Sequence, residues 1–130
     1  MIVVQNDDVR VGFELFGEDI NSPYDNPLDA SSLYDYNVYV YRDLKCKELL
    51  GIYKKANSGM FSIEVDGTQS NLIWVVISRE ILRYVTGKIL AEVKIQATAS
   101  SPFINNKANA GVTDIDLFTL LKSASPTALQ

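Results

Sequence analysis

Histidine is absent from this sequence of 130 residues, and cysteine occurs only once, at Cys46. Without histidine, the usual serine and cysteine triads are excluded, together with the commonest transition-metal ligand. A single cysteine cannot close a disulfide within the chain or build a zinc site, so the fold depends on packing alone. Cys46 lies between Lys45 and Lys47, which favours a thiolate, but it has no base to pair with, and we expect no reactive role.

Long apolar runs and phosphate-binding motifs are also missing. The longest apolar run, at residues 72–77, has six residues and is far shorter than the ~20 that a membrane-spanning helix needs. The seven glycines form neither GxGxxG nor GxxxxGK, so nothing favours nucleotide binding. The net charge of −4 gives no electrostatic reason to expect nucleic acid or an anionic membrane as a partner. No signal peptide is visible, so we expect a soluble protein that stays in the cytoplasm, unless a leader has been removed.

Carboxylates are plentiful and raise the question of a calcium loop. Counting from Asp19 puts Pro23 in the fifth position, Tyr24 where the glycine belongs and Ala30 where the bidentate glutamate belongs. This spacing excludes an EF-hand, while a looser calcium site stays open as an alternative to solvated loop carboxylates. We predict no metal, cofactor or catalytic residue. The acids that precede the second expected strand are Asp7, Asp8, Glu18, Asp19, Asp25 and Asp29.

Alternating apolar residues predict an all-β protein. Residues 88–98 put Ile89, Val93 and Ile95 on one face and polar residues on the other, which is typical of a strand with one buried face. Residues 72–77 are apolar on both faces, which predicts a central strand covered on each side. The expected strands are residues 9–16, 36–41, 48–54, 60–65, 72–77, 88–98 and 112–121.

Turn signals set the order of these strands. In residues 48–54, we expect Leu50 and Ile52 on one face and Leu49 and Tyr53 on the other. Ser78 begins one helical turn near residues 78–82 as its N-cap, and Gly87 permits the backbone to enter the next strand. Residues 17–32 and 99–111 are expected to be long loops, the first with one helical turn capped by Asp29 or Ser31.

About seven short strands without a long helix predict an antiparallel β-sandwich of immunoglobulin-like layout. Residues 1–122 are expected to form one domain, and residues 123–130 a flexible tail.

Tyrosine is the one unusual enrichment, with seven in the chain. Its side chain stacks on sugar rings and anchors protein interfaces, although cross-strand pairing within a sheet is the plainer interpretation. A small basic cluster of Lys45, Lys47, Lys54 and Lys55 is interpreted as a solvated hairpin tip rather than a phosphate site. The candidate interaction surface consists of Tyr39, Tyr41, Tyr53, Phe103 and Ile104.

Four segments follow one another in a familiar order. They are VGFELF at residues 11–16, NPLDAS at 26–31, YNVYVY at 36–41 and VVISREILRYVTGK at 75–88. In this order, residues 9–96 resemble the small β-sandwich domain at the N-terminus of upper baseplate proteins of tailed bacteriophages that infect Gram-positive hosts, and related phage tail and neck modules.

This resemblance implies a non-catalytic virion component, assembled in the host cytoplasm, that docks onto neighbouring tail or baseplate subunits or onto copies of itself. Sheet edges and the two long loops are the expected docking surfaces. The tyrosines and acidic loops leave a second hypothesis open, a carbohydrate- or cell-surface-binding module. A glycosidase that uses two carboxylates is a more distant third.

Overall fold

A computed structural model describes residues 2–4, 8–17, 26–43, 47–83, 85–105 and 115–121. These residues form a mainly β protein, as expected, with one short helix, α1 (Arg79–Leu82), and two short 3-10 turns, η1 (Ala30–Ser32) and η2 (Gly59–Phe61). The strands are β1 (Ile2–Val4), β2 (Val9–Glu14), β3 (Asp35–Asp43), β4 (Lys47–Lys54), β5 (Glu64–Val65), β6 (Leu72–Ile77), β7 (Gly87–Gln96), β8 (Ile104–Asn105) and β9 (Ile115–Leu121).

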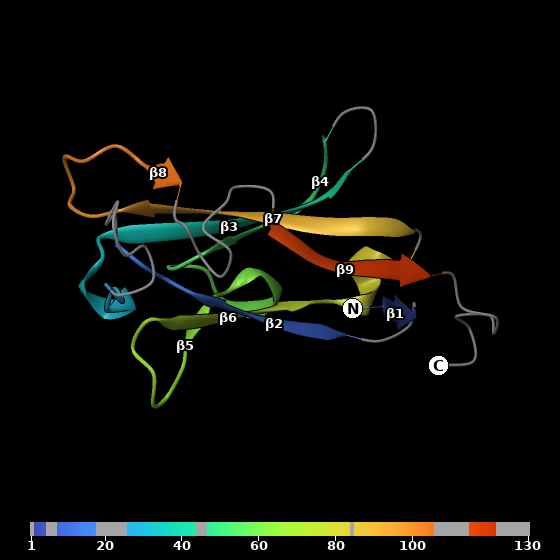
Figure 1. The fold of residues 1–130 in the computed structure, drawn as a ribbon, viewed down its shortest axis with the longest axis horizontal. Coiled ribbons are helices and arrows are strands. Elements are labelled where there is room, and N and C mark those ends of the chain that lie inside the picture. The colour runs from blue at the N-terminus through green and yellow to red at the C-terminus, as the bar shows by residue number, and fades with distance from the viewer. Residues whose placement is uncertain are drawn as a thin grey trace.

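The strands form two sheets that lie one over the other (Figure 1). The large sheet has the order β1-β9-β7-β3-β4, with β8 paired to β7, and the small sheet has the order β2-β6-β5. Among the described strands, the pairs are antiparallel except β1 with β9, which is parallel. The chain therefore leaves the large sheet after β1 and enters the small sheet with β2.

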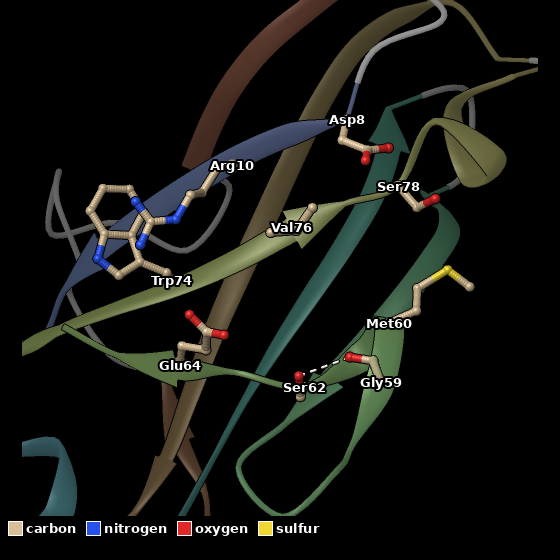
Figure 2. A pocket seen from close by; sticks show the side chains of 9 residues that line it. All are labelled: Asp8, Arg10, Gly59, Met60, Ser62, Glu64, Trp74, Val76 and Ser78. Carbon is tan, nitrogen blue, oxygen red and sulfur yellow. Dashed lines mark hydrogen bonds between the residues drawn. The ribbon is translucent and has the colours of Figure 1, made fainter. Parts of the chain in front are cut away.

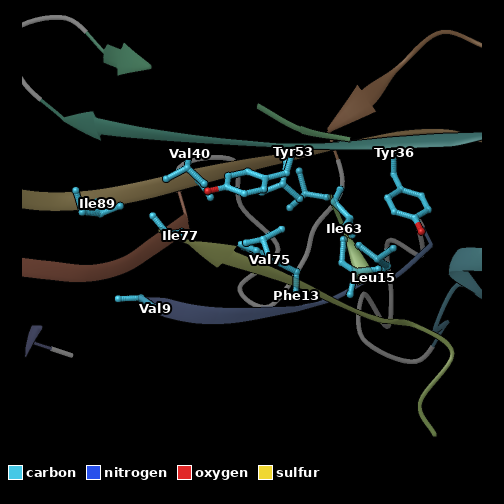
Figure 3. Close-up of a cluster of buried hydrophobic side chains, with 14 of the residues drawn as sticks. Val9, Phe13, Leu15, Tyr36, Val40, Tyr53, Ile63, Val75, Ile77 and Ile89 are labelled. Carbon is cyan, nitrogen blue, oxygen red and sulfur yellow. The ribbon is translucent and has the colours of Figure 1, made fainter. Parts of the chain in front are cut away.

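The core lies between the two sheets (Figure 3). Alternation along β2, β3, β6 and β7 places every second side chain there, so Phe13 of β2 and Ile77 of β6 belong to the same cluster as Val40 of β3 and Ile89 of β7. Burying such a side chain stabilises the fold by about 1.5–3 kcal/mol.

The helical turn follows the sequence prediction. The Ser78 hydroxyl accepts a hydrogen bond from the Glu80 amide at 3.1 Å, and Leu82 is fully buried in the core. Asp8 adds a second cap, since its Oδ1 accepts the Arg79 amide at 2.8 Å. Gly87, the first residue of β7, has φ of +100°, a backbone conformation that favours glycine, as expected for the entry into this strand.

Several predicted strand bounds change. The expected strand 60–65 is mostly the turn η2 followed by a two-residue strand, because Gly59 has φ of +73° and starts a tight turn there. β2 ends at Glu14, and Phe16 only forms an isolated bridge with Pro27. β1 and β8 were not expected, because two or three residues carry no readable alternation.

Parts of the predicted loops and the whole predicted tail lie outside the described residues, as do Cys46 and Asp7, Glu18, Asp19 and Asp25 of the acidic set. In the described part of residues 17–32, Asp29 caps η1 as predicted, with its Oδ1 accepting the Ser31 amide at 3.0 Å. No helix in the described ranges is both long enough and apolar enough to span a bilayer.

A β-bulge corrects the predicted faces of β4. Val40 pairs with Gly51 but Tyr41 pairs with Leu49, so Leu50 is the extra residue. This shift puts Leu49 on the outer face, where it is 53% exposed, while Tyr53 remains in the core opposite Val38. The expectation that Leu49 and Tyr53 share a face is therefore wrong.

Candidate functional site

The structure separates the five residues of the predicted interaction surface. Tyr53 is fully buried, and its ring centre lies 5.5 Å from that of Phe61. It pairs with Val38 on the neighbouring strand β3 and fills the core, so its assignment to a surface is wrong. Burial raises the pKa of its hydroxyl to about 12. Phe103 and Ile104 are 41% and 44% exposed, on the side of β7 away from β3.

Tyr39 and Tyr41 do come together, on the outer face of the large sheet. With Leu49 of β4 and Glu92 of β7 they line a shallow hollow of about 170 Å³, which we call the tyrosine face. Tyr41 is almost fully covered, whereas Leu49 is exposed. The tyrosine face therefore combines a fixed aromatic floor with an accessible aliphatic side chain.

Neighbouring polar groups position Tyr39. Its hydroxyl accepts a hydrogen bond from Asn37 Nδ2 at 3.4 Å, and Lys94 Nζ lies 5.8 Å from the centre of its ring. Lys94 and Glu92 are two residues apart on β7 and share the outer face, so opposite charges stand side by side next to the ring. An ion pair between Arg42 and Glu48 fastens the β3–β4 pair beyond Tyr41.

A larger pocket lies on the outer face of the small sheet (Figure 2). Its volume is about 300 Å³, and it is the site that sequence reasoning missed. We call it the tryptophan pocket, and its lining residues are Asp8, Arg10, Gly59, Met60, Ser62, Glu64, Trp74, Val76 and Ser78.

Trp74 is held on three sides. Its Nε1–H donates to Asp66 Oδ1 at 3.0 Å, and the Arg10 guanidinium carbon lies 3.8 Å from the centre of its ring. The ring lies against Gly12, because a Cβ there would fall 2.9 Å from Cζ3 of the indole. The hydrogen bond from Trp74, together with hydrogen bonds from the backbone amides of Gln69 and Thr68, holds the pKa of the Asp66 carboxyl well below its usual range.

This pocket corrects the interpretation of β6 as covered on both faces. Ile73, Val75 and Ile77 are buried, but Val76 on the other face is 44% exposed. One signal was available in the sequence: Arg10 and Gly12 alternate outward on β2, and a glycine there leaves room for a ring from the neighbouring strand. The pairing of β2 with β6 was needed to say which ring.

The two sites offer binding groups of different kinds. In the part of the chain that the structure describes, no three carboxylate or thiol side chains gather as a metal site would require. Of the predicted basic cluster, Lys55 donates to the Leu33 carbonyl at 2.6 Å and has a structural role. The tyrosine face offers aromatic and aliphatic contact, whereas the tryptophan pocket offers carboxylates, a guanidinium and hydroxyls around apolar side chains.

Similarity to known proteins assigns no role to either site. A scan against models of known protein families gives no match, and a search of curated proteins gives no significant one.

Proposed function

We propose that this chain is a non-catalytic structural module, of the phage or prophage tail or baseplate type, that docks onto neighbouring copies of itself through the tyrosine face. The order of the four sequence segments supports the phage type. The strand order supports an immunoglobulin-like sandwich: a three-stranded sheet faces a larger one, and the first strand runs parallel to the last in the larger sheet.

The main observation behind this proposal is the exposure of Leu49. Leu49 is 53% exposed beside two tyrosines on a sheet face. Covering this side chain with a partner removes apolar surface from water, which lowers the free energy of the complex. Leu49 lies on β4, the last strand in the described order of the large sheet, so a partner there also meets an open strand edge.

Charge on the same face favours a second copy as the partner. Glu92 pairs with Tyr39 across the β3–β7 pair, and Lys94, two residues further along β7, has its Nζ 5.8 Å from the centre of the Tyr39 ring. In a two-fold contact, each copy presents the same patch, and an axis that passes between Glu92 and Lys94 sets Glu92 of one copy against Lys94 of the other. Such pairs fix the register of a contact more than they add affinity.

Light scattering at increasing protein concentration tests this docking. We expect the wild-type chain to form a dimer or a larger closed oligomer, and Leu49→Lys to be a monomer. Met60→Lys is the matched control, because Met60 is 47% exposed but lies in the tryptophan pocket. A monomeric wild type, or equal association of Leu49→Lys and wild type, contradicts docking through this face.

Mass spectrometry of purified particles from the producing strain tests the virion role. We expect the chain in intact particles, at a copy number set by the symmetry of the tail. Its absence from every particle contradicts the phage part of the proposal and leaves the docking face to be judged by light scattering.

A further inference from the structure

We propose that the tryptophan pocket binds a neutral saccharide. The pocket lies on the small sheet, whereas the tyrosine face lies on the large one, so this site acts independently of self-association.

The polar groups of the pocket require a ligand that both donates and accepts hydrogen bonds. The Asp8 and Glu64 carboxylates only accept, and the Arg10 guanidinium only donates. A simple anion would be repelled by the two carboxylates, and a simple cation would be repelled by the guanidinium. A sugar hydroxyl donates through its hydrogen and accepts through its oxygen, so neighbouring hydroxyls satisfy groups of both kinds.

Two hydroxyls in the lining extend this pattern. Ser78 Oγ accepts the Glu80 amide and keeps its own O–H for a ligand. Ser62 Oγ donates to the Gly59 carbonyl at 2.8 Å and keeps lone pairs for a ligand, and Figure 2 shows this bond at the side of the pocket. The lining therefore offers both donors and acceptors to a ligand.

Apolar surface lies among these polar groups. Val76 and Met60 are both exposed in the pocket, and the C–H faces of a sugar ring pack against such side chains. The volume of about 300 Å³ is at the lower end of small-molecule sites, which run from about 300 to 1,000 Å³.

The walls are fixed before a ligand arrives. Trp74 is held by Asp66, by Arg10 and by contact with Gly12, and Asp8 is held by the Arg79 amide. Groups that are already ordered lose little conformational entropy on binding, which favours affinity for a small polar ligand.

Trp74 is the only tryptophan in the chain, so its emission reports on this pocket alone. Titration with glucose, galactose, N-acetylglucosamine and their β1,4-linked disaccharides is expected to give a saturable change for at least one sugar, with Kd of about 1 mM. Lysine amide and inorganic phosphate serve as cationic and anionic probes, and we expect neither to saturate.

Two variants complete the test, with calorimetry as a second readout. Glu64→Gln keeps the shape of an exposed side chain and is expected to weaken sugar binding roughly tenfold. Asp35→Asn is the control, because it makes the same acid-to-amide change on β3 of the large sheet, outside the pocket lining, and it should bind as the wild type does. The proposal is overturned by no saturation with any sugar, by saturation with lysine amide or phosphate instead, or by unchanged affinity in Glu64→Gln.

Discussion

The indole ring of Trp74 lies so close to Gly12 that a Cβ at residue 12 would fall 2.9 Å from Cζ3 of the ring. The two residues face each other across the β2–β6 pair. Glycine on β2 is thus what lets the tryptophan lie flat on the outer face of the small sheet, where the Arg10 guanidinium contacts its ring. The shape of the tryptophan pocket depends on this contact.

Gly12→Ala is therefore expected to displace the ring. Overpacking at this contact should lower the free energy of unfolding by about 1–2 kcal/mol and shift the emission of Trp74. Urea unfolding followed by fluorescence measures both. Gly67→Ala is the control, because nothing lies within 4 Å of a Cβ there, and its stability should change by less than about 0.5 kcal/mol. An unshifted, equally stable Gly12→Ala contradicts the contact.

Asp66 should make stability depend on pH below its ordinary pKa of 3.8. Hydrogen bonds from Trp74, Gln69 and Thr68 lower the pKa in the folded state, so the unfolded state binds the proton more readily. The stabilisation is fully present above pH 3.8 and is lost as the pH falls toward the lower, folded-state pKa.

Asp66→Asn keeps an acceptor for the indole but removes this titration. Its free energy of unfolding should fall less steeply than that of the wild type between pH 4 and pH 2, as measured by urea unfolding at each pH. Parallel pH profiles for the two proteins would show that Asp66 does not hold these bonds.

Tyr53→Phe is expected to stabilise the fold. Among the described residues, the buried Tyr53 hydroxyl has no hydrogen-bond partner, and such a group costs about 1–3 kcal/mol. Phenylalanine keeps the ring in the core, so we expect the free energy of unfolding to rise by about 1 kcal/mol. Thermal unfolding by calorimetry measures this, and a lower melting temperature would show that the hydroxyl is satisfied.

Local pattern was enough to predict β2, β6 and β7, the Ser78 cap and the positive φ of Gly87, because each depends on a few adjacent residues. The faces of β4 were not predictable, since the bulge at Leu50 appears only in its pairing with β3. Tyr53 was grouped with the surface residues from its residue type alone, and its pairing with Val38 places it in the core instead.

The tryptophan pocket needed knowledge of sheet order. Its lining comes from β2, β5, β6 and the turn η2, with Asp8, Ser62 and Ser78 next to them, and these segments lie apart in the sequence. Alternation along β2 places Arg10 on the outer face, but only the register that sets Gly12 opposite Trp74 shows what fills the space beside it.

A charge exchange on the tyrosine face tests two-fold docking most directly. Glu92→Lys and Lys94→Glu should each weaken association, because each sets like charges against each other across the contact. Combining both changes restores opposite charges. Analytical ultracentrifugation of the wild type, the two single variants and the double variant at one concentration measures this. We predict that the double variant regains the wild-type oligomer; association that is no stronger in the double variant than in the weaker single variant would contradict the account.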